Sequence, residues 1–286
     1  MEIKAYAKIN LGLDVLGRRS DGYHEVRMIM QNIGLSDVLS FEKTKEPGIR
    51  IYTEKEELPV NEDNLIFKAA RLLMDEFNIS EGIEIRLEKN IPIAAGLAGG
   101  STDAAATLKA VNELWNLSLS AEDLMKRGVK IGADVPYCIL GKTAVSEGIG
   151  EILTPITPCP FCYVLIAKPP VGVSTKYVYE HLEIDKLKHP DIDGIISGIE
   201  DGSIKRICDN LGNVLESVTV SMHPVIEKIK SLMKNNGAEN ALMSGSGPTV
   251  FGLFSDENSL KRAYKAVLES ELAGDVILTD IYTGEQ

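Results

Sequence analysis

The first third of the chain predicts long strands. Apolar residues are frequent in residues 2–16, and Lys4, Lys8, Asn10 and Asp14 occupy alternate positions among them. Because successive side chains of a strand point to opposite faces, these four should share one face, so that Lys8 and Asn10 project together. The run 26–33 predicts a second long strand, and residues 36–53 predict further short ones.

Apolar residues three and four positions apart predict helices further on. One helix is expected over 63–77 with Asp63 as a cap, and another over 120–131 with Ser120 as its N-cap. Between them, a strand over 83–88 leads through a glycine-rich loop into a third helix. The apolar face of that helix comprises Ala104, Ala105, Leu108, Val111 and Trp115.

The second half begins after a proline-rich crossing. Strand-like runs at 143–147 and 151–156 precede Pro155, Pro158 and Pro160. Prolines interrupt regular structure, so we expect a domain boundary there, with domains 1–157 and 158–286. Beyond it we expect strands at 163–168 and 276–282, a turn between two strands within 240–254, and helices at 174–183, 191–199, 204–220, 223–235 and 257–270.

The stretch 92–105, PIAAGLAGGSTDAA, carries the clearest chemical signal. Gly96, Gly99 and Gly100 lie between a strand and a helix, and Ser101, Thr102 and Asp103 offer N-cap side chains. Unpaired backbone N–H groups at a helix N-terminus, beside the positive end of the helix dipole, favour an anion. The stretch therefore predicts a phosphate-binding loop. The alternative is a glycine-rich connection that binds nothing.

The amino-acid sequence excludes two familiar kinds of phosphate-binding loop. A P-loop needs glycine five positions before Gly141 of the only Gly-Lys-Thr, but Pro136 stands there. The dinucleotide fingerprint fails as well, because Leu153 and Val250 occupy the positions of its third glycine. A phosphate would bind here through a different kind of loop.

Composition limits the class of protein. The 286 residues are 44% hydrophobic and carry a net charge of −12, which is typical of a globular protein and argues against nonspecific binding to nucleic acid or acidic membranes. The N-terminus lacks a signal-peptide core, so a cytoplasmic location is expected. The four cysteines, including the pair Cys159 and Cys162, are interpreted as incidental and reduced because no second ligand pair accompanies them.

Four further residues each allow two interpretations. Lys8 is either a solvated strand residue or a functional cation, and Asp134, among apolar neighbours before Pro136, is either locally hydrogen-bonded or kept for acid–base work. Tyr23 and His24 follow an Asp-Gly turn, and could either close a hairpin or contact a base.

Four separated stretches together resemble the GHMP kinases. They are KINLGLDVLGRRSDGYHEV at 8–26, PIAAGLAGGSTDAA at 92–105, GADVPYCILG at 132–141 and MSGSGPTVFG at 243–252. The resemblance covers nearly the whole chain in order and spacing. It implies an α+β fold of two domains: an N-terminal domain like ribosomal protein S5 with a left-handed βαβ crossover, and a C-terminal ferredoxin-like α/β sandwich.

The resemblance also implies a reaction. It implies ATP-dependent phosphorylation of the 2-hydroxyl of a cytidine-diphosphate-linked methylerythritol, an isoprenoid precursor, with Asp134 as the catalytic base and Lys8 as its partner. ATP and Mg²⁺ are the implied cofactors, with the metal held mainly by the nucleotide and Ser101 as its possible protein ligand. The residues implied to wrap the ATP phosphates are Pro92, Ile93, Ala94, Ala95, Gly96, Leu97, Ala98, Gly99, Gly100, Ser101 and Thr102.

By the same resemblance, Tyr23 and His24 would receive the cytidine, and Tyr179 would supply the opposite stacking face, with Tyr177 competing for that role. Asn10 would face the methylerythritol end. Gly245 and Gly247 would let the second domain's turn close over the substrate.

Two positions in the glycine loop are open to question. Ala98 stands where many GHMP kinases have glycine, and its methyl group should be tolerated if the φ angle is negative. Asp103 could be a helix cap or a catalytic group, and we favour the cap because an acidic first turn stabilises a helix.

Two alternatives remain at the level of function. One is a GHMP kinase for another small alcohol, such as mevalonate, homoserine or a sugar, which would have no use for a base-binding Tyr23-His24 pair. The other is a non-catalytic nucleotide-binding protein on the same scaffold, which would have no use for Lys8 and Asp134. The sequence does not report the oligomeric state.

Overall fold

The structure is a computed structural model that describes residues 1–284. Contacts divide the chain into two compact units that interleave along the sequence. Unit 1 comprises residues 1–7, 35–93 and 98–141, and unit 2 comprises residues 8–34, 94–97 and the chain from 142 onward. The expected boundary between residues 157 and 158 divides the chain differently and stays a prediction.

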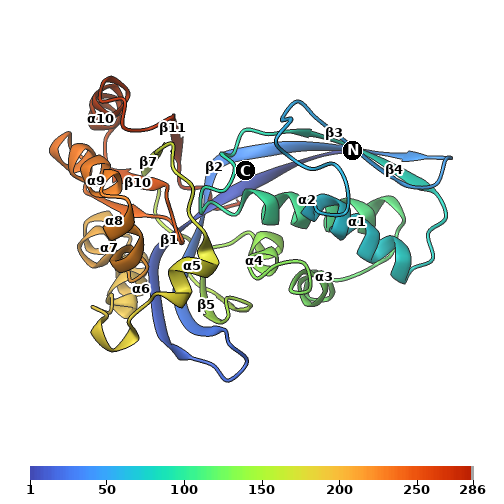
Figure 1. Ribbon diagram of the computed structural model, residues 1–286, viewed down its shortest axis with the longest axis horizontal. Coiled ribbons are helices and arrows are strands. Elements are labelled where there is room, and N and C mark those ends of the chain that lie inside the picture. The colour runs from blue at the N-terminus through green and yellow to red at the C-terminus, as the bar shows by residue number, and fades with distance from the viewer. Residues whose placement is uncertain (285–286) are drawn as a thin grey trace. The chain divides into compact units, whose positions relative to one another are not determined.

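Unit 1 is a sheet covered by helices (Figure 1). β4 pairs antiparallel with β2 and parallel with β3, and α1 and α2 pack together against the sheet. The core between these layers includes Ala69, Leu73, Ile83, Ile85 and Leu108, all fully buried. Its elements are the start of β1 (Glu2–Arg18), the end of β2 (His24–Thr44), β3 (Ile49–Thr53), α1 (Leu65–Glu76), β4 (Gly82–Glu88), α2 (Gly99–Leu114), α3 (Ala121–Gly128) and α4 (Val135–Leu140).

Unit 2 contains part of a seven-stranded sheet, to which β3 and β4 also belong, and the whole of a four-stranded one. In the first, β1 pairs parallel with β8, while β5 pairs antiparallel with both β2 and β6. The second is an antiparallel sheet in the order β11–β7–β10–β9, with α9 and α10 packed against it. The elements first met here are β5 (Ala144–Gly148), β6 (Ile152–Pro155), β7 (Tyr163–Lys168), α5 (Thr175–Glu180), a 3₁₀ turn (Ile184–Lys186), α6 (Ile192–Glu200), α7 (Ile204–Asn210), β8 (Gly212–Asn213), α8 (Glu216–Met222), α9 (Val225–Asn235), β9 (Asn240–Met243), β10 (Val250–Phe254), α10 (Glu257–Glu269) and β11 (Asp275–Asp280).

Most expected elements are present, with three corrections. The cap of α1 is Asn64, whose side chain accepts from the backbone of Ile66, so the expectation of Asp63 was wrong. The helix expected over 204–220 is interrupted, because residues 212–213 leave the helical conformation to pair with β1. The sequence analysis also missed α4. Ser120 does cap α3, in a capping box with Asp123.

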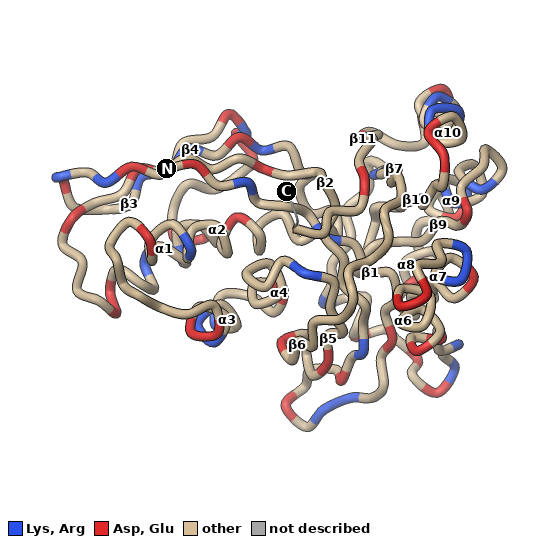
Figure 2. The backbone as a smooth tube through the Cα atoms, turned by 180° about the vertical axis from the view of Figure 1, so that it is seen from behind, with Lys and Arg blue, Asp and Glu red and all other residues tan. Residues whose placement is uncertain are grey.

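Charged residues of both signs are interspersed along each unit (Figure 2). α3 illustrates the pattern: Glu122 and Asp123 lie in its first turn, while Lys126 and Arg127 lie in its last. This arrangement complements the helix dipole at both ends. Across residues 1–284, no helix is both long enough and apolar enough to cross a membrane.

Candidate active site

β1 brings Lys8 and Asn10 to one face, as the alternation predicted. Both side chains are buried, and Lys8 Nζ donates to Asn10 Oδ1 over 2.8 Å. The amide group of Asn10 lies against Met28, with Nδ2 and Sδ 3.5 Å apart. Since a buried ammonium is costly without polar partners, Lys8 is not a solvated strand end.

In unit 2, the middle of the glycine loop joins this face of β1. The backbone N–H of Lys8 donates to the carbonyl of Leu97 over 3.1 Å. Gly96 has a φ of +72°, and a Cβ there would lie 2.3 Å from the carbonyl oxygen of Ser244. The Ser244 hydroxyl donates in turn to the carbonyl of Gly96 over 3.0 Å. Glycine is therefore required at position 96 by conformation and by close backbone contact.

The turn between β9 and β10 completes this cluster. Gly245 has a φ of +56°, and its missing Cβ would lie 3.2 Å from the Gly96 carbonyl oxygen and 3.7 Å from Asn10 Oδ1. Gly247 has a φ of +86°, and a Cβ there would meet Met243 at 2.5 Å. Unit 2 thus brings together strand, loop and turn residues from three distant parts of the sequence.

In unit 1, the end of the glycine loop begins α2, but not as expected. The helix begins at Gly99 after Ala98, and no side chain caps it. Ser101, Thr102 and Asp103 lie inside the helix, so their expected role as caps was wrong. Ala98 has a φ of +57°, which contradicts the negative φ that its methyl group was expected to need. An uncapped helix N-terminus with the half-buried Ser101 beside it suits an anion.

Asp103 instead forms a buried ion cluster with Asp37 and Lys89. Lys89 Nζ contacts Asp103 Oδ2 at 2.7 Å and also pairs with Asp37, and all three side chains are at most 4% exposed. Asp37 Oδ1 accepts from the backbone N–H groups of Asn90 and Ile91. Burial raises the pKa of Asp103 to about 8, while Lys89 opposes the rise and Asp37 adds to it.

This cluster holds the two ends of the glycine loop in unit 1. Asp37 binds the backbone just before Pro92, and Asp103 lies in the second turn of α2. Sequence reasoning missed Asp37 and Lys89, because Asp37 is 52 residues away from Lys89. The only local signal was a lysine at a strand end directly before the glycine loop.

Asp134 lies in unit 1 at the start of α4. It occupies the N-cap position with φ of −82° but makes no capping hydrogen bond with its side chain. The expectation of a helix end or turn at Asp134 is confirmed, and its role as a base stays a prediction. Ser101 lies near the same segment, since a Cβ on Gly132 would be 3.8 Å from its hydroxyl.

Of the residues predicted to bind the base, His24 and Tyr179 lie together in unit 2. The rings of His24 and Tyr179 lie 5.2 Å apart at 37°, while Tyr177 stacks on His181 at 3.7 Å. Tyr23 is 59% exposed. Burial, followed by the charge of Arg18, lowers the pKa of His24 from 6.5, so its imidazole is neutral at pH 7. A neutral imidazole can both donate and accept hydrogen bonds.

The cysteines are free and buried, as expected. Burial raises the pKa of Cys159 to about 12 and also raises those of Cys162 and Cys208. Thiols with such pKa values are poor nucleophiles at neutral pH. The Cys159–Cys162 pair therefore adds no chemistry to the site.

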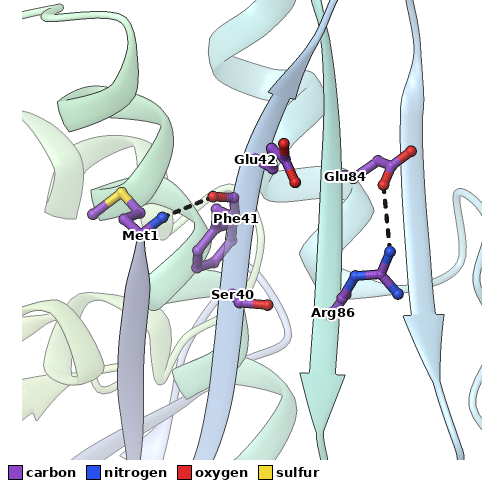
Figure 3. Close-up of a pocket in the computed structure, with 6 residues that line it drawn as sticks. All are labelled: Met1, Ser40, Phe41, Glu42, Glu84 and Arg86. Carbon is purple, nitrogen blue, oxygen red and sulfur yellow. Dashed lines mark hydrogen bonds and ion pairs between the residues drawn. The ribbon is translucent and has the colours of Figure 1, made fainter.

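A pocket of about 220 Å³ lies on the sheet of unit 1 (Figure 3). Three of its charged groups are paired within it: the Met1 ammonium donates to the Phe41 carbonyl over 2.9 Å, and Arg86 pairs with Glu84 at 3.6 Å. Ser40 and Glu42 complete the lining. None of these residues was predicted to act in the site, and we assign the pocket no role.

Comparisons with known proteins identify the family of the chain. Residues 64–142 match the family described as GHMP kinases N terminal domain, and residues 195–273 match GHMP kinases C terminal. The chain belongs to the GHMP kinases. As such it is an enzyme, an ATP-dependent small-molecule kinase.

Individual relatives indicate which kinases of this family the chain is similar to. The chain is 57% identical to 4-diphosphocytidyl-2-C-methyl-D-erythritol kinase of Lachnoclostridium phytofermentans over 92% of this chain and 91% of that protein. It is 50% identical to the kinase of the same name from Bacillus subtilis, over 92% and 91%. A crystal structure of 4-(cytidine 5'-diphospho)-2C-methyl-D-erythritol kinase aligns with a TM-score of 0.85 at 32% identity, covering 99% of this chain and all of that one. The two-domain GHMP kinase fold expected from the sequence is confirmed.

Proposed function

We propose that this chain phosphorylates the 2-hydroxyl of 4-diphosphocytidyl-2-C-methyl-D-erythritol with ATP, in the non-mevalonate route to isoprenoid precursors. The observation that carries the proposal is the 57% identity, over 92% of the chain, to a kinase named for that substrate. Homoserine kinase from Cytophaga hutchinsonii shares the fold with a TM-score of 0.78, but at 20% identity it carries no argument about substrate.

The aromatic residues of unit 2 support a substrate that contains a nucleobase. In this proposal the neutral imidazole of His24 reads the cytosine edge by hydrogen bonds, and Tyr23 and Tyr179 offer the stacking faces. The 5.2 Å between the rings of His24 and Tyr179 favours Tyr179 over Tyr177, whose ring already stacks on His181. Stacking on an aromatic ring suits any base, and the hydrogen bonds then discriminate among bases.

The glycine loop is proposed to hold the ATP phosphates. The uncapped amides at the start of α2 and the positive end of its dipole supply the attraction. The proposed contacts run from Pro92 to Thr102. Mg²⁺ is proposed to be bound mainly through the nucleotide, with help from Ser101, since this ion takes few protein ligands when it binds with phosphates.

The proposed chemistry needs a base and a cation at the acceptor hydroxyl. ATP with Mg²⁺ supplies the γ-phosphoryl group when bound. Asp134 takes the proton from the 2-hydroxyl as the O–P bond forms and the bond to ADP breaks. Lys8 stabilises the developing negative charge on that oxygen, and Asn10 orients the Lys8 ammonium through their 2.8 Å hydrogen bond.

Three assignments accompany this proposal. The protein is proposed to be cytoplasmic. Its domain boundary is proposed to fall between residues 157 and 158. Its partners are proposed to be the small-molecule substrate and ATP, without nucleic acid or membrane. The net charge of −12 supports the exclusion of nucleic acid.

The test is ADP release by the purified protein with ATP, Mg²⁺ and the cytidylated substrate. We expect saturable turnover in the wild type and a fall of about 10²- to 10⁴-fold in kcat for Asp134→Asn, the range typical of general acid–base groups. Asp75→Asn, an exposed change on α1, is the control. Near-normal turnover of Asp134→Asn would remove the base assignment, and saturation by homoserine or mevalonate alone would reassign the substrate.

A further inference from the structure

Asn213 makes a set of buried hydrogen bonds at the Gly-Ser-Gly turn. Its Nδ2 group donates to the carbonyls of Met243 and Gly245, each over 2.8 Å, and its Oδ1 accepts from the backbone N–H of Leu215 over 3.0 Å. The residue is 7% exposed. A single side-chain amide therefore holds the two carbonyls on either side of Ser244.

The position of Asn213 is itself fixed by the strand that carries Lys8 and Asn10. Asn213 pairs with Leu13 of β1 in the short parallel strand β8, and Val214 N donates to the Leu13 carbonyl over 3.0 Å. This pairing is what interrupts the helix expected over 204–220. Residues 212–213 therefore make strand hydrogen bonds to β1 in place of helical ones. This pairing places Asn213 between β1 and the Gly-Ser-Gly turn.

Other buried or half-buried groups hold the same turn. Glu216 Oε1 accepts from the backbone N–H of Met243 over 2.9 Å, and its Oε2 contacts Lys230 at 2.7 Å. The Thr219 hydroxyl donates to the Ser246 carbonyl over 3.2 Å. Since buried polar groups are costly when unpaired, this network restricts the turn to one conformation.

The Gly-Ser-Gly turn also holds the glycine loop. Ser244 donates through its hydroxyl to the carbonyl of Gly96, and Gly245 packs against Gly96 and Asn10. A shift of the turn would move the Gly96 carbonyl and open the contact with Asn10. Two contacts therefore connect the groups that Asn213 holds to the loop: the Ser244 hydroxyl on the Gly96 carbonyl, and the packing of Gly245 against Gly96.

We propose that Asn213 is a positioning residue for phosphoryl transfer. By holding the carbonyls on both sides of Ser244, it keeps the Ser244 hydroxyl on Gly96, and so holds the phosphate loop in register with Lys8 and Asn10 on β1. This proposal rests on the proposed function, because it assumes that the loop binds ATP. Asn213 itself contacts no substrate.

The test uses three single variants. Asn213→Asp keeps the acceptor for Leu215 but replaces the donor with a carboxylate that faces two carbonyls. Ser244→Ala removes only the hydroxyl that reaches Gly96. Asn240→Asp is the matched control, because it is the same substitution at an asparagine of β9 whose amide donates to the Cys208 carbonyl over 2.7 Å, away from the loop.

We expect kcat to fall about 10- to 100-fold in Asn213→Asp and about 3- to 10-fold in Ser244→Ala, since small displacements of a reacting group have effects of this size. The KM for the cytidylated substrate should stay within about 2-fold, because His24 and Tyr179 are untouched, and Asn240→Asp should keep kcat within about 2-fold. Amide hydrogen exchange of residues 94–97 should be faster in the first two variants than in the wild type or the control.

Two results would overturn the positioning role. One is an equal loss of kcat in Asn240→Asp, which would indicate general destabilisation. The other is unchanged exchange at 94–97 in both Asn213→Asp and Ser244→Ala. Because exchange is measured without substrate, it decides the matter even if the wild type does not phosphorylate the cytidylated substrate, a result that would contradict only the proposed function.

Discussion

Ala98 adopts a backbone conformation that usually belongs to glycine. Its φ of +57° places its Cβ close to the following carbonyl, at a cost of about 1–2 kcal/mol. Ala94, with a φ of +50°, has the same geometry. The loop thus stores strain at two positions, and the alanine at position 98, where many GHMP kinases have glycine, has an energetic cost.

Ala98→Gly should therefore stabilise the fold. We expect the free energy of unfolding to rise by about 0.5–1 kcal/mol, less than the full strain because glycine also gains freedom in the unfolded chain. Ala266→Gly, inside α10, is the control and should lower it by about 0.5–1 kcal/mol. Urea denaturation measures both. Equal losses in the two variants would show that the positive φ carries no strain.

Single variants of Tyr179 and Tyr177 can be compared to identify the residue that stacks on the base. Loss of a stacking ring typically costs about 1–3 kcal/mol, so Tyr179→Ala should raise the KM for the cytidylated substrate roughly 5- to 150-fold. Tyr177→Ala should leave it within about 2-fold, since Tyr177 stacks on His181. Steady-state kinetics at saturating ATP measure the difference, and the reverse order of effects would reassign the stacking face.

Among the elements, α2 is tied to the sheet of unit 1 by a titratable group. The pKa of Asp103 is raised to about 8 from an ordinary 3.8, chiefly by burial. The folded protein therefore binds this proton more tightly than the unfolded chain does. This contribution to stability is complete below about pH 4 and is lost progressively as the pH rises to about 8.

Asp103→Asn should remove this dependence. We expect the free energy of unfolding of the variant to fall less steeply than that of the wild type between pH 5 and pH 8, because an amide does not titrate. Urea denaturation at several pH values measures the slope, and Asp75→Asn, on the surface of α1, should leave it unchanged. Parallel slopes for Asp103→Asn and the wild type would show that Asp103 is already ionised at pH 5.

Elements whose residues are fixed by local periodicity were predictable. β7 lies where its apolar run placed it, and Lys8 and Asn10 share a face as alternation requires. The wrong predictions concern positions whose conformation is set by contacts with distant parts of the chain. Asp103 turns to Lys89 instead of capping α2, and residues 212–213 leave the helical pattern to pair with β1. Neither choice is encoded in the neighbouring sequence.

At the scale of the whole molecule, the family resemblance supplied what periodicity could not. Spacing and composition indicated a phosphate loop in an acidic globular protein, while the two-domain architecture came from four motifs taken together. The net charge of −12 also means that the attraction of an anionic ligand has to come from local groups, of which the uncapped start of α2 in unit 1 is one.

The most direct measurement is the position of the phosphate in the product. Phosphorus NMR of the reaction of ATP with 4-diphosphocytidyl-2-C-methyl-D-erythritol should show one new phosphomonoester, on the 2-oxygen, for each ADP formed. Homoserine and mevalonate should yield none under the same conditions. A phosphomonoester on either of those alcohols, or its absence from the cytidylated substrate, would contradict the account.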